Sequence, residues 1–389
     1  MVPTPESSAG NGSLAPGGAG SAARNVNGSG PGAGGPVANG PRSNGAGAGT
    51  ATVAAPATSR KDWVSDQEVK WCPGCGDFTI LAAVQMLLPE IGVRPESTVF
   101  ISGIGCSSRF PYYMNTYGIH SIHGRAPALA TGLAIARPDL DVWVVTGDGD
   151  ALSIGGNHFI HLMRRNVNLT ILLFNNQIYG LTKGQYSPTS ETGKVTKSTP
   201  YGSLDAPFNP VSLAIGAEAT FVARTHDMDR KHMTEMLRRA HDHKGTGFVE
   251  IYQNCNVYNN GAFEDITAKE NRASNLIPLE HGRPIRFGEN GEHCVVRNPD
   301  GSLRVAEVAD VGEDAAVIHD EYLEDSSPAF ALSRLASGPH EPTPIGVFRD
   351  ISRPEYSEEV TRQVATAQAS EGEPDLKSLI FSGGTWSTN

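Results

Sequence analysis

Two apolar, β-rich runs in the middle of the chain each stop abruptly at polar residues. The first run, residues 142–146, is followed by a Gly-Asp-Gly segment centred on Asp148, and the second, residues 169–174, by the pair Asn175-Asn176. A helix-like segment lies between them, and the 28 residues from Asp148 to Asn176 match the length of one βαβ unit. Ligands bind beyond the carboxyl ends of strands in an open parallel sheet, so we expect both motifs to face one site.

The same alternation of strand-like and helix-like runs continues on both sides of this unit. It predicts further strands at 97–102, 219–224 and 247–252, and helices at 78–88, 126–136, 210–215 and 228–241, with another helix beginning near Gly155. We therefore predict an α/β fold with a mostly parallel sheet and helices on both faces. The predicted strand ends all carry glycine, cysteine or polar residues, which indicates a common site.

Composition divides the chain into three parts. Residues 1–59 consist mainly of Gly, Ala, Ser, Asn and Pro, and we expect them to be disordered because they cannot bury enough surface to offset chain entropy. Residues 60–270 carry the α/β pattern. Residues 271–389 are expected to form a peripheral, partner-contacting extension with a β-hairpin at 295–305.

The polar loop 182–208 is long enough to be an active-site lid or a partner-contact loop.

Charge and hydropathy exclude several classes of partner. The net charge of −11 gives no electrostatic case for binding nucleic acid. No apolar run approaches the roughly 18 residues of a membrane span, and no secretory signal pattern is present, so we expect a cytoplasmic protein without a membrane partner. The chain has five cysteines, and an odd count without an export signal favours a metal or cluster site over disulfides.

Asp148 and Asn176 offer a carboxylate and an amide oxygen, and Ile178 could add a main-chain carbonyl. Such oxygen ligands suit Mg²⁺, which often completes its coordination shell with phosphate. The sequence thus favours a diphosphate held through Mg²⁺. Two ordinary strand-end turns are the alternative, because Gly, Asp and Asn are common there. The offset between the two motifs makes the functional interpretation the stronger one.

Four cysteines lie at predicted turns or strand ends, namely Cys72, Cys75, Cys106 and Cys255. Taken by themselves, four thiolates fit tetrahedral Zn²⁺ and a [4Fe–4S] cluster equally well. A thioredoxin-type redox pair is a third option, but the Pro-Gly insert between the first two cysteines and the presence of two more argue against it. Cys294 lies outside any motif and is expected to be a small packed residue.

Together these motifs carry a family resemblance. The chain resembles the β subunit of 2-oxoacid:ferredoxin oxidoreductases over roughly residues 61–290, and its thiamine diphosphate motif is similar to that of thiamine-dependent enzymes. The segments that carry the resemblance are 71–76, 103–109, 147–149 with 175–176, and 178–185. As a set they are highly specific, although no single one would be.

The resemblance implies roles for particular residues. It assigns a [4Fe–4S] cluster to the four cysteines, and Mg²⁺ to the side chains of Asp148 and Asn176 and the carbonyl of Ile178. It also implies that thiamine diphosphate is contacted by Ile104, Gly105, Cys106, Ser107, His123, Gly149, Asp150, Gly180 and Leu181. An alternative for His123 is a helix-start residue bonded to the backbone.

Arg109 and His123 are the candidate catalytic residues. A guanidinium at position 109 could grip a substrate carboxylate bidentately, while a surface arginine or a bond to a backbone carbonyl is the alternative. Thr182 and Lys183 are weaker candidates of the same kind.

The resemblance also implies a reaction and its partners: a 2-oxo acid, coenzyme A and oxidised ferredoxin give acyl-CoA, CO₂ and reduced ferredoxin. The family places the second thiamine-binding domain in an α subunit, so we expect an αβ pair, doubled to (αβ)₂, and no activity from this chain alone. Segment 105–113 and the C-terminal extension look more like those of the 2-oxoglutarate-type β subunits, which favours 2-oxoglutarate over pyruvate or a branched-chain or aryl 2-oxo acid. Alternatives of other classes are a zinc-stabilised, non-catalytic interaction subunit and a non-redox thiamine decarboxylase.

Overall fold

The computed structural model describes residues 58–335 and 341–388, so the predicted disordered segment 1–59 lies almost entirely outside the described residues. A main sheet of eight strands has the order β2-β1-β3-β4-β6-β5-β11-β7. Its strands are β1 (Thr98–Ser102), β2 (Tyr117–His120), β3 (Asp141–Gly147), β4 (Leu169–Asn175), β5 (Phe221–His226), β6 (Thr246–Tyr252), β7 (Leu276–Leu279) and β11 (Thr343–Asp350). All neighbouring pairs are parallel except β11 with β5.

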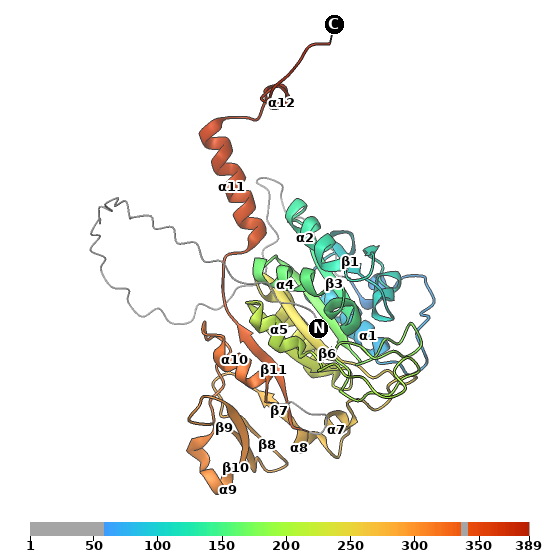
Figure 1. Ribbon diagram of the computed structural model, residues 1–389, viewed down its shortest axis with the longest axis vertical. Coiled ribbons are helices and arrows are strands. Elements are labelled where there is room, and N and C mark those ends of the chain that lie inside the picture. The colour runs from blue at the N-terminus through green and yellow to red at the C-terminus, as the bar shows by residue number, and fades with distance from the viewer. Residues whose placement is uncertain (1–57, 336–340, 389) are drawn as a thin grey trace, which may run out of the picture. The chain divides into compact units, whose positions relative to one another are not determined.

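Helices cover both faces of this sheet (Figure 1). Successive residues of β3 alternate between the two cores: Val142 and Val144 face one, and Trp143 and Val145 face the other. On the first face lie α2 (Ala126–Ala136), α4 (Gly156–Arg165), α5 (Pro210–Gly216) and α10 (Ser327–Ser333), and on the second α1 (Asp77–Glu90) and α6 (Arg230–Asp242). The predicted three-layer α/β fold is confirmed.

A second sheet of three antiparallel strands has the order β10-β9-β8. It comprises β8 (Arg286–Phe287), β9 (His293–Arg297) and β10 (Leu303–Glu307), and the last two form the predicted hairpin. The shorter elements are η1 (Arg60–Trp63), η2 (Pro95–Ser97), η3 (Ser107–Tyr113), η4 (Glu313–Ala315), α3 (Asp148–Leu152), α7 (Glu264–Thr267), α8 (Arg272–Asn275) and α9 (Val308–Val311).

The predicted boundary at residue 270 needs correction. Both β7 and β11 lie within 271–389, yet they pair inside the main sheet, so this part of the chain is not wholly peripheral. The last helices of the described chain, α11 (Tyr356–Glu371) and α12 (Leu376–Ile380), are exposed along nearly their whole length. The strand β11 escaped prediction because Pro344 and Gly346, which ordinarily interrupt strands, lie inside it.

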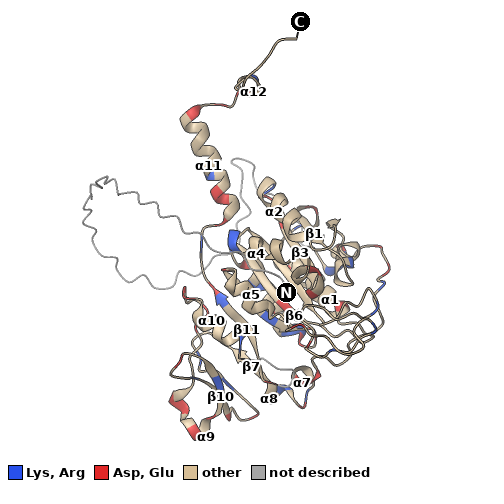
Figure 2. Ribbon diagram, in the orientation of Figure 1, with Lys and Arg blue, Asp and Glu red and all other residues tan. Residues whose placement is uncertain are grey.

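Charge and hydropathy are distributed as the sequence suggested. Figure 2 shows basic and acidic residues interspersed along the ribbon in that view. Among the described residues, no helix combines the length and apolar character needed to cross a membrane.

The contact between β6 and α6 yields a stability prediction. A Cβ atom on Gly247 would lie 2.1 Å from the carbonyl oxygen of Ala240, so the helix packs directly on the strand backbone. We expect Gly247→Ala to lower the free energy of unfolding by about 1–3 kcal/mol, because such overpacking forces the backbone apart. Chemical denaturation measures the change.

Gly132→Ala is the matched control. Gly132 lies in α2, and a Cβ atom there would meet no atom within 4 Å. Alanine is the better helix former, so this variant should be unchanged or slightly stabilised. Equal unfolding midpoints for the two variants would contradict the packing assignment.

Candidate active site

Two adjacent parallel strands deliver the predicted motifs to one edge of the main sheet. Gly147 at the end of β3 pairs with Phe174 of β4, so Asp148 and the pair Asn175-Asn176 follow neighbouring strand ends. The next strand, β6, pairs with the other side of β4 and ends just before Gln253. The common site that the sequence indicated therefore has a structural basis.

Asp148 is a buried carboxylate with two hydroxyl partners. Its Oδ2 accepts hydrogen bonds from Ser187 Oγ at 2.5 Å and from Thr189 Oγ1 at 2.6 Å. Burial raises the pKa of the Asp148 carboxyl to about 6, and the two hydroxyl bonds oppose that rise. An anionic carboxylate at this position would gain from a nearby cation, which fits the chemistry of a Mg²⁺ ligand.

The paired asparagines have different partners. Asn175 Nδ2 donates to Glu250 Oε1 at 2.8 Å inside the sheet, whereas Asn176 Nδ2 donates to Gln253 Oε1 at 2.8 Å near the edge. The Oδ1 atom of Asn176 accepts from the amide of Ile178 at 3.2 Å, which turns the chain after β4. Asn176 and Ile178 thus lie in one turn, next to the strand that supplies Asp148.

Asp150 binds protein donors from three segments. Its Oδ1 accepts from the amides of Ile104 at 2.9 Å and Gly124 at 2.7 Å and lies 2.7 Å from His123 Nδ1, while its Oδ2 accepts from Thr146 Oγ1 at 2.8 Å. The predicted contact of Asp150 with the diphosphate region stays a prediction. The side chain orients His123, because a carboxylate at Nδ1 keeps the proton on that nitrogen and leaves Nε2 for another partner.

Two glycines allow unusually close backbone approach beside Asp148. A Cβ atom on Gly149 would lie 2.1 Å from the ring of Tyr179, and one on Gly155 would lie 2.4 Å from the carbonyl oxygen of Asp150. The hydroxyl of Tyr179 also donates to the carbonyl of Gly149 at 3.1 Å. Any larger residue would displace the segment that follows β3, where the diphosphate is expected.

The four predicted cysteine ligands gather at one place. A Cβ atom on Gly180 would lie 3.5 Å from Cys255 Sγ and 3.7 Å from Cys106 Sγ, so this glycine keeps space open beside two thiols. Burial, followed by nearby negative charge, raises the pKa of the Cys106 thiol to about 11, and Cys255 and Cys72 are among the groups that contribute. The pKa of Cys75 is raised in the same way, with Cys255 and Cys106 contributing. Cys75 and Cys106 therefore each lie close enough to two other thiols to interact with them.

The spacing of these thiols is not that of a single-ion site. Within 58–335 and 341–388, no three His, Cys, Asp or Glu side chains converge on a position that one metal ion could occupy. Trp71 Nε1 donates to the carbonyl of Cys106 at 2.7 Å, and Gln253 Nε2 lies 3.3 Å from Cys75 Sγ. These contacts help to fix the positions of the segments that carry Cys106 and Cys75.

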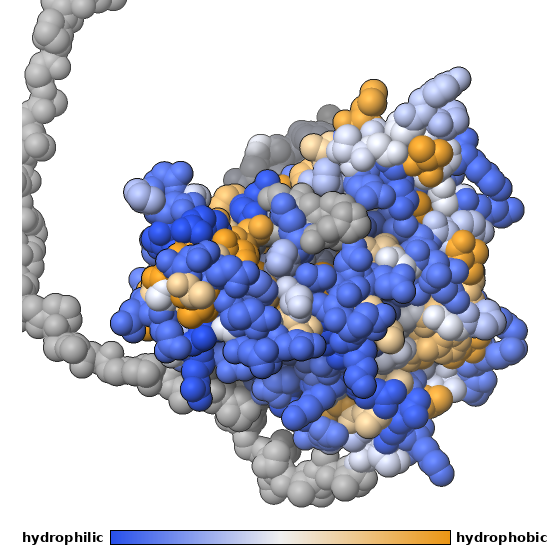
Figure 3. Space-filling model, turned by 90° about the horizontal axis from the view of Figure 1, so that it is seen from below, coloured by the Kyte–Doolittle hydropathy of each residue, from blue (hydrophilic) through white to orange (hydrophobic). Residues whose placement is uncertain are grey.

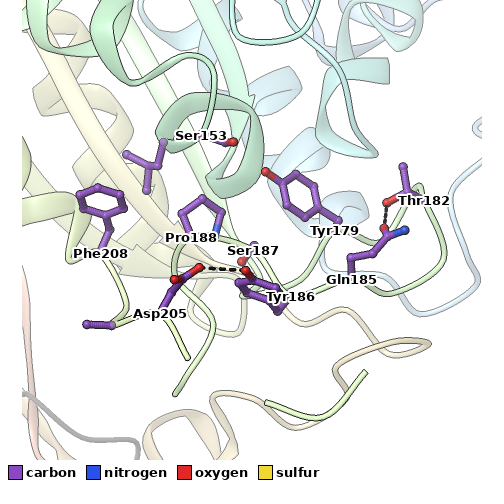
Figure 4. A pocket seen from close by; sticks show the side chains of 11 residues that line it. Ser153, Tyr179, Thr182, Gln185, Tyr186, Ser187, Pro188, Asp205 and Phe208 are labelled. Atoms are coloured by element: carbon purple, nitrogen blue, oxygen red, sulfur yellow. Dashed lines mark hydrogen bonds between the residues drawn. The ribbon is translucent and has the colours of Figure 1, made fainter. Parts of the chain in front are cut away.

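The long loop 182–208 folds over the end of β4 and is anchored there. Besides the two bonds to Asp148, Ser190 Oγ donates to the carbonyl of Gln177 at 2.6 Å. A pocket of about 750 Å³ lies under the loop (Figure 4), and Tyr186 donates to Asp205 at 2.8 Å in its wall. The lining residues are Leu152, Ser153, Tyr179, Thr182, Gln185, Tyr186, Ser187, Pro188, Asp205, Ala206 and Phe208.

The remaining predicted residues surround this region with different exposure. Ser107 is buried beside the end of β3, since a Cβ atom on Gly147 would lie 3.3 Å from its Oγ. Ile104 and Leu181 are exposed. Arg109 donates from Nη1 to the carbonyl of Lys70 at 2.9 Å, which is the backbone bond named as its alternative role.

Sequence reasoning missed three residues of the site. Ser187 and Thr189 were not singled out, because hydroxyls in a polar loop follow no periodic pattern. Asp77 is fully buried beside Cys75, its carboxylate oxygens have no hydrogen-bond partner among the described residues, and burial raises its pKa to about 7. Only its place in the cysteine motif could have drawn attention to it.

Known proteins resemble this chain over most of its length. Residues 103–251 match the model of the thiamine pyrophosphate enzyme, C-terminal TPP binding domain. The 2-oxoglutarate oxidoreductase subunit KorB of Mycobacterium tuberculosis is 60% identical over 344 residues, which cover 88% of this chain and 91% of that protein. The 2-oxoacid:ferredoxin oxidoreductase 1 subunit beta of Aeropyrum pernix is 50% identical over 210 residues, covering 54% and 64%.

Among solved structures, 2-oxoglutarate:ferredoxin oxidoreductase from Magnetococcus marinus, with 2-oxoglutarate, coenzyme A and succinyl-CoA bound, superposes with a TM-score of 0.67. It is 34% identical and covers 84% of this chain and 97% of that one. The family resemblance is confirmed by similarity that extends over nearly the full length of the relatives from Mycobacterium tuberculosis and Magnetococcus marinus. This chain belongs to the β-subunit family of the 2-oxoacid:ferredoxin oxidoreductases and is a thiamine diphosphate-binding subunit of an enzyme.

Proposed function

We propose that the protein is the β subunit of an enzyme that oxidatively decarboxylates 2-oxoglutarate with coenzyme A, giving succinyl-CoA and CO₂ and passing electrons to ferredoxin. One observation carries this proposal: the carboxyl ends of β1, β3, β4 and β6 are followed by Cys106, Asp148, Asn176 and Cys255, and Cys72 and Cys75 just before the start of α1 interact with these thiols. The choice of 2-oxoglutarate rests on the relatives from Mycobacterium tuberculosis and Magnetococcus marinus. Pyruvate and other 2-oxo acids are less favoured.

Mg²⁺ would be held by Asp148, Asn176 and the carbonyl of Ile178. The hydroxyls of Ser187 and Thr189 fix the orientation of the Asp148 carboxylate, so it does not need to reorganise when a cation binds. Thiamine diphosphate, when bound, supplies carbanion stabilisation after loss of CO₂ from the 2-oxo acid.

The cofactor would lie against the loops that Asp150 organises. Ile104 and Gly105 come from one of these loops and His123 from the other, and Asp150 leaves His123 Nε2 directed away from its carboxylate. Cys106 and Ser107 continue the first loop. Gly149, Gly180 and Leu181 complete the predicted contacts, with the glycines preventing steric conflict.

We assign the four cysteines to a [4Fe–4S] cluster rather than to zinc. A cluster has four thiolate ligands but a larger core than one ion, which suits thiols that do not converge on a single-ion position. The burial of Cys106 and Cys75 disfavours free thiolates, and binding to iron would stabilise the deprotonated form.

An α subunit is the proposed partner, in an αβ pair doubled to (αβ)₂. The main sheet supplies one thiamine-binding domain, and the second would come from that subunit. The end of the chain offers a surface for it, since apolar side chains are exposed on and after α12, namely Leu376, Leu379, Ile380, Phe381 and Trp386. Five unpaired cysteines fit the proposed cytoplasmic location.

Removing the charge of Asp148 tests the metal site. We expect Asp148→Asn to weaken Mg²⁺-dependent binding of thiamine diphosphate about 100-fold or more, because the variant keeps the volume of the side chain but loses the anionic ligand. Isothermal titration calorimetry on the assembled complex measures the affinity. Asp139→Asn, at an exposed residue paired with Arg137, is the control and should bind normally; equal affinities would refute the assignment.

Cysteine replacement tests the cluster. Wild-type protein purified without oxygen should contain about four irons with acid-labile sulfide and absorb broadly near 400 nm. We expect Cys255→Ala to lose most of this iron, whereas Cys294→Ala should retain it, because Cys294 is packed in the core of the small sheet. One zinc per chain and no visible absorbance in the wild type would rule out the cluster.

Arg109 is proposed to bind a carboxylate of the substrate with the donors that its bond to Lys70 leaves over. Arg109→Gln should raise KM for 2-oxoglutarate about tenfold or more, with a smaller effect on kcat, since a charge-assisted hydrogen bond is lost. Steady-state kinetics with Arg137→Gln as a surface control measure this. An unchanged KM for 2-oxoglutarate would show that Arg109 does not bind the substrate carboxylate.

A further inference from the structure

A cleft of about 380 Å³ separates the main sheet from the small three-stranded sheet. Its walls come from the end of β5, the start of α6, and from α8, β7, β8 and β11 (Figure 1). None of its lining residues belongs to the proposed thiamine or cysteine site, and none is shared with the pocket under the loop 182–208. Clefts between structural units are common ligand sites, so the side chains inside it are of interest.

His226 presents a hydrogen-bond donor to this cleft. The residue is only 1% exposed, and its Nδ1 accepts a hydrogen bond from the amide of Met228 at 3.2 Å. A neutral ring with an acceptor at Nδ1 carries its proton on Nε2. No described residue accepts from that nitrogen, so it is available to a ligand in the cleft that His226 lines.

Arg272 adds a second set of donors. Its Nη2 donates to the carbonyl of Thr267 at 3.1 Å, while its Nε is buried without a hydrogen-bond partner among the described residues. The guanidinium is close enough to His226 to affect its titration: burial first, and then the charge of Arg272, lower the pKa of His226 to about 4. The imidazole therefore stays neutral, and the arginine supplies the positive charge.

One carboxylate also borders the cleft, and it already serves as a helix cap. Asp229 is the N-cap of α6, where its Oδ1 accepts from the amide of His232 at 3.1 Å. Arg286 lies on the far wall and brings a second guanidinium. Arg286 is already engaged, because its Nη1 lies 3.6 Å from Glu313 Oε1 and its Nε and Nη2 donate to the carbonyl of Gly291. Arg272 forms no ion pair within 4 Å among the described residues, so its charge remains to attract an anion.

The other side of the cleft is apolar. Phe287 and Ile345, both almost fully buried, contribute to its wall. Figure 3 shows a mainly hydrophilic surface in the view from the side of the small sheet, with apolar residues scattered among polar ones. This combination suits a small amphiphilic molecule better than a broad protein contact.

We infer that this cleft binds a small organic anion, with a phosphate or carboxylate group held by Arg272 and His226 and an apolar body against Phe287 and Ile345. The group would accept hydrogen bonds from the Nε2 of His226 and the unpaired Nε of Arg272, and both donors would then be satisfied. A metal site does not explain the cluster, because no three of the described His, Cys, Asp and Glu side chains converge on one ion position. The inference does not depend on the proposed reaction.

Calorimetry with two probes tests the cleft. The assembled complex, saturated with thiamine diphosphate and Mg²⁺ at fixed ionic strength, is titrated with phenyl phosphate and with benzoate, and with benzyl alcohol as the neutral control. We expect saturable binding of at least one anion and at least tenfold weaker binding of benzyl alcohol. The better of the two anions identifies the preferred head group.

Variants locate the binding. Arg272→Gln should weaken anion binding at least tenfold, while Arg283→Gln, at an exposed arginine outside the cleft, should not. Ala273→Trp, at an exposed position on the rim, should block the cleft without removing a polar group, and it serves as the second test should Arg272→Gln fold poorly.

Three outcomes would overturn the inference. They are no saturable binding of either anion, binding that Arg272→Gln and Ala273→Trp leave unchanged, or binding that disappears in Arg109→Gln while it persists in the cleft variants. The last result would place the anion at the proposed substrate site instead.

Discussion

The parallel strands β1, β3, β4 and β6 all end on the same side of the main sheet, and the site depends on that geometric constraint. The register fixes it locally: Gly147 pairs with Phe174, and Asn175 pairs with Tyr252. A shift of one residue in either pairing would turn the side chains that follow the strands to the opposite face. The complete burial of β3 and β4 between two helical layers makes such a shift costly.

Buried hydrogen bonds extend this constraint from the sheet to Asp148, the proposed Mg²⁺ ligand. Arg224 Nε donates to Glu250 Oε2 at 2.7 Å, and the other oxygen of Glu250 accepts from Asn175. The Oδ1 of Asn175 accepts from the amide of Gln177 at 3.2 Å and lies 2.9 Å from Thr189 Oγ1, whose single hydroxyl proton it shares with Asp148 Oδ2 at 2.6 Å. Every side chain in this hydrogen-bond network has a partner. The network therefore avoids the free-energy cost of unsatisfied buried polar groups and holds Asp148 in one orientation. The same hydrogen-bond network explains why the loop 182–208 lies against the site, since Thr189 belongs to that loop.

The elements that position the site were predictable because their signals are local. Strands β3 and β4 are uninterrupted apolar runs that end at recognisable polar motifs, and helices α1 and α2 have apolar faces of ordinary periodicity. The strand β2 is four exposed residues at a sheet edge, and β11 contains Pro344 and Gly346, so neither has a pattern that distinguishes it from a loop. Their places in the sheet are set by tertiary pairing.

The same distinction applies to the site residues. Asp148 and Asn176 could be named because each follows a strand directly. Ser187 and Thr189 could not, since their contact with Asp148 depends on how a long loop folds back. Asp150 was recognised as important, but its sequence position does not reveal that its carboxylate would bind the backbone amides of Ile104 and Gly124.

The most direct test of the account is electron paramagnetic resonance of the anaerobic αβ complex, frozen after mixing with 2-oxoglutarate and coenzyme A. If a cluster on the four cysteines receives electrons from the substrate, the spectrum should gain the signal of a reduced [4Fe–4S] cluster within the turnover time. That signal should disappear when oxidised ferredoxin is added in excess. Release of CO₂ from 2-oxoglutarate without any cluster signal at any time would contradict the central claim.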